Sequence, residues 1–362
     1  MDRKIFVLLR SVGFSALPAA LLFLASCASS SRAYRLDAHC ERTAIGNYEI
    51  RWGLDPVAKG KIHISVSDDP SVSVVDSAFD EWIDAGRVTY VTKDNFSPKF
   101  FRLSFPDQDV ERVVGLRVTR LDSVRYMWDM GGVTNSDGFD TSWGRVCYSE
   151  LFRNFSPLDV RKINSMRFHS QIVLGCEAGR GEDVETDGST VYLPSASSLT
   201  LESFLQQTVD SSLSRKDIRS KVRSLFLSYI DQNNDQTRQA LLLAADPEMH
   251  PILFCSEYPW GVLSFLGMLM LKVCDVPDRA VIDVYTEINR LADMTKWHRK
   301  VCLASEGQQE AFTYLITAHG DLLMEVMDEI RVRYGSFSNY FSQEIGFGPE
   351  DQARLRRNLL SN

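Results

Sequence analysis

The sequence is poor in cysteine, histidine and net positive charge, and these shortages exclude several classes of protein. Its 362 residues contain seven cysteines and six histidines. No two cysteines stand close together, so neither a zinc site nor a disulfide framework is expected. The formal net charge of −8 argues against nucleic acid as a partner and against a surface held to membranes by basic residues. We therefore predict no metal, no cofactor and no nucleic-acid partner.

Long apolar runs are also scarce, and the main one lies at the N-terminus. It follows Arg3, Lys4 and Arg10 and ends at Leu24-Ala25-Ser26-Cys27. With roughly 15 residues it is shorter than a membrane-spanning helix and has the layout of an export signal. Its last four residues resemble the bacterial lipobox, in which the cysteine receives the lipid, including palmitate. An ordinary secretory signal with an incidental cysteine is the alternative.

These features predict a lipoprotein signal peptide over residues 1–27 and lipid attachment at Cys27. The expected location is the bacterial cell envelope, either the outer membrane or a periplasm-facing membrane. Cleavage would remove three basic residues and Asp2, which changes the formal net charge from −8 to −10. With 44% hydrophobic and 24% charged residues, the rest is ordinary globular material that is long enough for two domains.

A tether and two regions with different hydrophobic periodicity follow the signal. Residues 28–44 are predicted as a tether, because they open with small polar residues. Residues 45–120 contain several segments of period-2 alternation with turn residues at their ends, which indicates a small all-β sandwich. Residues 121–362 alternate strand-like and helix-like segments, which indicates an α/β domain with a mostly parallel sheet.

Four segments of the α/β region resemble, in order, a bacterial tyrosine-phosphatase-like family with a cysteine phosphatase fold. That family reads N-F-R-D-L-G-G, then W-G-x-x-Y-R-S, a strand ending D-L-R, and the nucleophile loop H-C-x-A-G-K-D-R-T-G. Here "YMWDMGG", "SWGRVCYSEL", the stretch from His250 to Pro277 and the C-terminal helical segment occupy equivalent places. The matched positions outside the loop are Asp129, Gly131, Gly132, Trp143, Gly144 and Ser149. Some exported members carry a similar sandwich before this domain.

The departures from the family pattern fall on the residues that its chemistry needs. Such an enzyme uses a thiolate nucleophile, a glycine-rich loop and an arginine that holds the phosphoryl oxygens. Aligned without gaps, the family histidine falls on Cys255, the nucleophile on Ser256 and the loop arginine on Val262. If Cys255 is taken as the nucleophile, the arginine position falls on Gly261. Glu257 would repel a phosphate dianion.

Aromatic residues stand at or near several of the replaced positions. Trp128 and Tyr148 occupy places where the family has arginine, and Tyr258 and Trp260 lie in the loop. They predict either a binding cleft for a protein or carbohydrate partner, or a vacated cavity that the rings fill. Asp129 keeps its family position, and beside two glycines it is expected to be a turn carboxylate rather than an acid. A disulfide between Cys255 and Cys176 is a further hypothesis.

The sequence therefore predicts a lipid-anchored envelope protein with a vestigial phosphatase loop, in which no catalytic residue is expected and the domain binds or acts as a scaffold. Two alternatives remain open. One is a divergent phosphatase or esterase that uses Cys255. The other is an adhesion or carbohydrate-binding lipoprotein in which the sandwich is the working part.

Overall fold

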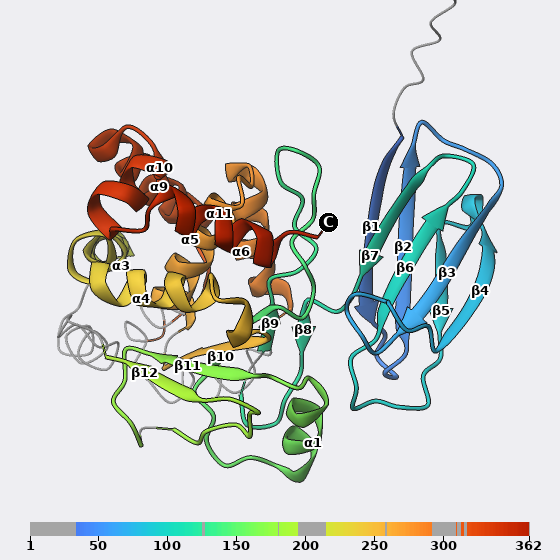
Figure 1. Cartoon of the computed structure of the whole chain (residues 1–362), viewed down its shortest axis with the longest axis horizontal. Helices are drawn as coiled ribbons and strands as arrows, with labels where there is room; N and C mark the ends of the chain where they lie inside the picture. The colour runs from blue at the N-terminus through green and yellow to red at the C-terminus, as the bar shows by residue number, and fades with distance from the viewer. Residues whose placement is uncertain are drawn as a thin grey trace, which may run out of the picture. The chain divides into compact units, whose positions relative to one another are not determined.

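A computed structural model describes residues 34–124, 127–179, 181–194, 215–257, 259–291, 309, 313–314 and 317–361. Its first region is all β (Figure 1). The elements there are β1 (Arg35–Arg42), β2 (Tyr48–Asp55), β3 (Lys61–Ser67), β4 (Ser77–Trp82), η1 (Ile83–Ala85), β5 (Arg87–Tyr90), β6 (Phe100–Phe105) and β7 (Val110–Val114). They form two antiparallel sheets, of order β1-β2-β5 and β4-β3-β6-β7.

The buried side chains of this region come from alternate positions of its strands. In β2, for example, Tyr48, Ile50 and Trp52 are buried while the residues between them are more exposed. They join the inward residues of β3 and β6 in one core, which is how two amphipathic sheets bury their apolar faces. A β-rich region that precedes the α/β domain is thereby confirmed.

The predicted tether is wrong for part of its length, because β1 occupies Arg35–Arg42 inside the range 28–44. Its inward positions are Ala38 and Cys40, both buried. Small inward residues weaken the alternation of apolar and polar positions on which strand prediction depends. The pairing of β1 with β2 runs along the full length of both strands.

The second region alternates strands and helices. Its elements are β8 (Val118–Thr119), β9 (Met127–Asp129), β10 (Val146–Glu150), α1 (Pro157–Ser165), β11 (Ser170–Leu174), β12 (Thr190–Leu193), α3 (Arg215–Gln232), α4 (Asn234–Ala244), η2 (Pro247–Met249), β13 (Ile252–Ser256), η3 (Pro259–Leu263), α5 (Ser264–Val273), α6 (Asp278–Leu291), α9 (Gly320–Tyr334), α10 (Phe337–Asn339), η4 (Tyr340–Ile345) and α11 (Pro349–Leu359). Because β8 already pairs with β9, this sheet begins slightly before the predicted boundary at residue 121.

The sheet of this region is mixed rather than uniformly parallel. Its order is β12-β11-β13-β10-β9-β8. The pairings among β12, β11, β13 and β10 are parallel, whereas β10-β9 and β9-β8 are antiparallel. An antiparallel edge on a parallel sheet is common in α/β folds. The central strand β13 is buried along its whole length, as its uninterrupted apolar sequence predicts.

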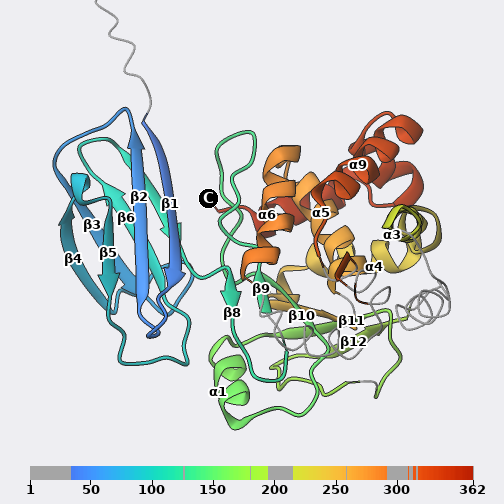
Figure 2. The same ribbon diagram turned by 180° about the vertical axis from the view of Figure 1, so that it is seen from behind.

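Helices cover both faces of this sheet, and alternate side chains of the strands face different cores. The helices α3, α4, α5, α6, α9 and α11 lie on one face and α1 on the other (Figure 1, Figure 2). Tyr148 and Phe254 belong to the core that contains the larger set of helices. Cys147 and Cys255 belong to the core on the α1 side. We call these faces the helical face and the α1 face.

Candidate functional site

The strand that leads into the loop aligned with the family's nucleophile loop directs Cys255 and Ser256 to different faces. Cys255 is fully buried and packs in the core of the α1 face, among residues such as Val173 and Leu253. Ser256 is the last residue of β13 and is 4% exposed. Because side chains alternate along a strand, only one of these two residues can face the helical side.

The surroundings of Cys255 are those of a structural thiol. Its Sγ lies 3.6 Å from Nε2 of Gln171, and the neighbouring strands cover it on both sides, with Ser149 and Val173 as its paired residues. Burial raises its pKa to about 12, and the Gln171 hydrogen bond only partly opposes this shift. Since the thiolate is the nucleophilic form, the environment works against reactivity.

The proposed disulfide between Cys255 and Cys176 is contradicted, because both thiols are buried and no disulfide joins them. The strand register places them at different levels of the sheet. Cys255 pairs with Val173, whereas Cys176 lies beyond Leu174, the last residue of β11. A disulfide needs Cα atoms within about 7 Å.

The loop after β13 continues into helix instead of curling around an anion. The π-helix η3 begins at Pro259 and leads directly into α5. A Cβ at Gly261 would lie 2.5 Å from the Tyr229 hydroxyl of α3, so this glycine permits close packing of two helical segments. Val262 packs against the core of the helical face. Neither residue has a side chain that could bind phosphate.

Glu257 forms an ion pair that places a cation at the loop. Arg153 Nη2 donates to its Oε1 at 3.0 Å. Both side chains are partly exposed, so the pair contributes little to stability. Arg153 was not predicted, since it lies outside the aligned motifs. Its position matters because a guanidinium already paired with the loop's own carboxylate is not free to hold a phosphoryl group.

Two of the four predicted cleft aromatics come together, and they do so in the helical-face core. Trp128 of β9 and Tyr148 of β10 are directly paired across the strands, and both are buried. Tyr258 lies outside the described residues, as does the side chain of Trp260. The structure therefore brings together half of the predicted cleft and leaves its other half untested.

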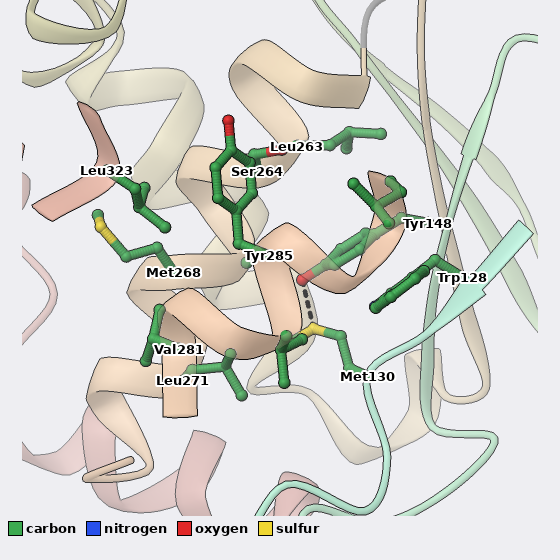
Figure 3. Close-up of a pocket in the computed structure, with 13 residues that line it drawn as sticks. Trp128, Met130, Tyr148, Leu263, Ser264, Met268, Leu271, Val281, Tyr285 and Leu323 are labelled. Carbon is green, nitrogen blue, oxygen red and sulfur yellow. Dashed lines mark hydrogen bonds between the residues drawn. The ribbon is translucent and has the colours of Figure 1, made fainter. Parts of the chain in front are cut away.

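Trp128 and Tyr148 line a partly open cavity of about 60 Å³ (Figure 3). This exceeds the roughly 10–15 Å³ that one water needs. Strands β9 and β10 and helices α5, α6 and α9 enclose it. The described lining residues are Trp128, Met130, Tyr148, Leu263, Ser264, Gly267, Met268, Leu271, Val281, Val284, Tyr285, Ile288 and Leu323.

The residues that α6 contributes to this lining form a recognisable helix pattern in the sequence. Val281, Val284, Tyr285 and Ile288 follow the i, i+3, i+4, i+7 spacing of one helix face. The helix α6 is one of the helix-like segments expected between residues 121 and 362. The sequence did not indicate that this face borders a cavity. Side-chain volumes alone do not show where the packing between elements leaves space.

Asp129 is a turn carboxylate, as predicted. Its Oδ1 accepts from the backbone N–H of Gly131 at 2.8 Å, and its Oδ2 accepts from that of Gly144 at 2.9 Å. Burial raises its pKa to about 6, against the opposing effects of these N–H donors and of Arg117. Both oxygens are engaged in holding two loops together, so the group is poorly placed to protonate a leaving group.

Arg117 is a buried cation near these loops that sequence reasoning missed. Its guanidinium lies 4.9 Å from the ring centroid of Trp143 and 5.7 Å from that of Trp128. It donates to the carbonyl oxygen of Asp129 at 2.8 Å and also to that of Gly131. Burial lowers its pKa. Arg117 precedes the first family-like motif, so no pattern marked it.

The glycines of the first motif and the tryptophan of the second pack directly on each other. A Cβ on Gly131 would lie 2.4 Å from Trp143 Cα, and one on Gly132 would lie 2.4 Å from the Trp143 ring. Trp143 Nε1 in turn donates to the Val113 carbonyl at 2.9 Å. We call Asp129, Gly131, Gly132, Trp143 and Gly144 the motif cluster. Its members meet to form a structural unit.

Neither metal clusters nor spanning helices occur in the described part of the chain. No group of three or more histidine, cysteine, aspartate or glutamate side chains there is arranged to hold a metal ion. No helix among the same residues has the length and apolar character needed to cross a membrane. Cys27, the predicted lipid attachment site, lies outside the described residues.

Comparison with known proteins agrees with this mixed sheet and its motif cluster. The sequence model described as "Tyrosine phosphatase family" matches residues 119–361, which is more than half of the chain. No curated protein matches the sequence. The chain belongs to the tyrosine phosphatase family, and the resemblance predicted from four sequence segments is confirmed.

Proposed function

We propose that this protein is an exported, lipid-anchored member of the family whose phosphatase-like domain binds a partner instead of cleaving phosphate. The observation that carries the proposal is at the end of β13. The position aligned with the nucleophile is Ser256, and the adjacent thiol of Cys255 is buried in the core of the α1 face. A serine hydroxyl is a far weaker nucleophile than a thiolate unless a base activates it.

The loop geometry supports the same proposal. Phosphoryl transfer to a cysteine needs several donors that converge on the three phosphoryl oxygens. Here the Glu257 carboxylate stands at the start of the loop and is paired with Arg153, and the following residues form the turns of η3. Pro259, the first residue of η3, has no N–H to donate, and the nearby Glu257 carboxylate would repel an anion.

The aryl phosphatase assay tests the proposal. We expect purified protein to hydrolyse an aryl phosphate no faster than its Cys255→Ala and Ser256→Ala variants, because neither side chain acts as a nucleophile. Thermal unfolding of each variant serves as the control for folding. Turnover by the wild-type protein that disappears in either folded variant would overturn the proposal and favour the divergent hydrolase.

Thiol labelling gives a second, independent check. Iodoacetamide should leave Cys255 unmodified in the native protein at pH 8, since the thiol is buried and its pKa is raised to about 12. The same cysteine should react once the protein is unfolded in urea. Peptide mass spectrometry measures both states. Rapid labelling of Cys255 in the native state would contradict the buried, protonated thiol.

The N-terminal features define where this binding domain would act. We propose lipid attachment at Cys27 and a location in the bacterial cell envelope, with the membrane as one partner and a protein or carbohydrate as the other. The lipobox-like sequence supports this part of the proposal.

A further inference from the structure

The Tyr148 hydroxyl has unusually weak hydrogen-bond partners for a buried phenol. It donates to the Met130 sulfur (Figure 3) and lies 3.7 Å from the Met270 sulfur. Thioether sulfur is a weak acceptor, whereas a buried tyrosine hydroxyl usually finds a stronger one. This hydroxyl lines the cavity, so a better acceptor that entered the cavity could replace the sulfur.

The rest of the cavity is uncharged and mostly apolar, with Ser264 and Tyr285 as its other hydroxyl-bearing residues. None of the described lining residues carries a charge, and most are aliphatic, aromatic or sulfur-containing. An anion would lose its hydration there without gaining a counter-charge. The surroundings therefore disfavour phosphate, the group that the family's chemistry requires, and favour a neutral molecule that buries apolar surface.

Gly267 of α5 leaves the space that the Tyr148 ring occupies. A Cβ on this residue would lie 3.0 Å from the Tyr148 hydroxyl oxygen and 3.1 Å from its ring. The absence of a side chain at this point lets the phenol lie against the helix with its oxygen at the cavity wall. The entrance to α5 also contributes, since Leu263 and Ser264 line the same space. The cavity thus begins where the vestigial loop ends.

We propose that this cavity binds a small, neutral, mainly apolar molecule with one carbonyl-type oxygen, which accepts the hydrogen bond of Tyr148 in place of Met130. The inference rests on the proposed function, because it names a ligand for a domain retained for binding. The apolar wall supplies the affinity and the phenol supplies the preference for an oxygen-bearing ligand. Because the cavity is small and partly open, a larger molecule would insert only its end.

A methyl NMR titration of the full-length protein tests the proposal. Acetone serves as the probe, because a cavity of about 60 Å³ is too small for a ring, and 2-methylpropene, in which a CH₂ group replaces the oxygen, serves as the matched control. We expect the ketone to shift the ¹³C-methyl resonances of Met130 and Met268 in a saturable way. The hydrocarbon should shift the same methyls through apolar contact alone, because it has no acceptor for the Tyr148 hydroxyl. Failure of the ketone to shift these two methyls in a saturable way overturns the proposal.

Two variants locate the site. Tyr148→Phe should reduce ketone binding about fivefold and leave hydrocarbon binding unchanged. Val284→Phe should fill the cavity and abolish binding of both probes, whereas Val332→Phe, at a residue that is 82% exposed, should have no effect. If Val284→Phe does not fold, Tyr148→Phe still decides. Unchanged ketone binding in Tyr148→Phe, or in folded Val284→Phe, contradicts the assignment.

The two proposals fail independently. Hydrolysis of the aryl phosphate would refute an inactive loop and leave the ketone titration unaffected. Loss of the ketone effect with an inactive loop would refute the cavity as a ligand site and leave the absence of catalysis standing. A third result, binding of inorganic phosphate that shifts the Met130 methyl, would overturn the neutral-ligand proposal alone.

Discussion

At the scale of single residues, the protein uses several carboxylates to organise its loops. Asp159 is the clearest case, because it is fully buried. Its Oδ1 accepts from the Asp122 N–H at 2.7 Å and its Oδ2 from the Ser123 N–H at 2.8 Å. The same residue completes a capping box with Ser156 at the start of α1. One side chain therefore joins a helix N-terminus to the segment before β9.

Replacing this carboxylate should destabilise the fold. Asp159→Asn keeps one acceptor oxygen and loses the other, so one of the two backbone N–H groups loses its acceptor. We expect the free energy of unfolding at pH 7 to fall by about 2 kcal/mol. Asp137→Asn, at an exposed turn residue, is the control and should have almost no effect. Urea unfolding measures both. Equal stability of Asp159→Asn and wild type would refute the structural role.

The difference should also depend on pH. Burial alone would raise the pKa of Asp159, but the N–H groups of Asp122, Ser123 and Ser156 outweigh it and lower the pKa. A lowered pKa in the folded state means that the stabilisation is present above about pH 4 and is lost as the pH falls further. The gap between wild type and Asp159→Asn should therefore shrink in acid.

At the scale of elements, the motif cluster shows which family features serve packing. Gly131 and Gly132 allow the first motif to lie against Trp143 of the second, and Asp129 ties both turns together. All five members of the cluster fit the family pattern. The replaced positions, Trp128, Tyr148 and Val262, are those where the family carries arginine. The positions that match the family therefore serve packing, and the positions that differ are those of its arginines.

A glycine substitution tests the packing role. Gly131→Ala would place its Cβ 2.4 Å from Trp143 Cα, and backbone atoms cannot move aside cheaply, so we expect a loss of about 2–4 kcal/mol in unfolding free energy. Gly138→Ala is the matched control. The φ of Gly138 is +91°, which would add about 1 kcal/mol of strain to an alanine. Apart from its chain neighbours, no heavy atom lies within 4 Å of the position that the alanine Cβ would take. A smaller loss for Gly131→Ala than for Gly138→Ala would contradict the model of close packing.

How well these elements could be predicted depended on their local pattern. The strand Ile252–Ser256 and the helix that follows can be predicted from their apolar runs, because uninterrupted hydrophobicity marks elements buried on all sides. The strand β1 was missed because Ala38 and Cys40 are small. The face to which Cys255 points could not be predicted without the strand register, since a shift of one residue reverses every side chain. The cavity beside Tyr148 depends on packing between segments that are far apart in the sequence.

At the scale of the whole molecule, the chain has an expected membrane anchor followed by two folded regions, and its formal net charge is negative. The lipid would supply the attachment, because two or three acyl chains at about 0.8 kcal/mol per buried methylene hold a protein stably in a bilayer. The net charge of −8 would add nothing on an anionic membrane surface. Attachment should therefore depend on a single residue, Cys27.

Detergent partitioning measures that dependence. We expect the wild-type protein expressed in a bacterial host to incorporate labelled palmitate and to enter the detergent phase of Triton X-114. Cys27→Ser should do neither. Cys40→Ala, which alters a buried cysteine of the sandwich, is the control and should behave as wild type. Palmitate incorporation that persists in Cys27→Ser would refute the assigned attachment site.

The close contact between Gly131 and Trp143 has a consequence for how such proteins are counted. A sequence signature that contains these residues reports whether two turns can pack together, and that requirement does not depend on the reacting groups. Genome surveys that tally phosphatases by this signature will include members of this kind. Inspection of the strand-end residue and of the residue six positions beyond it would separate working enzymes from inert relatives.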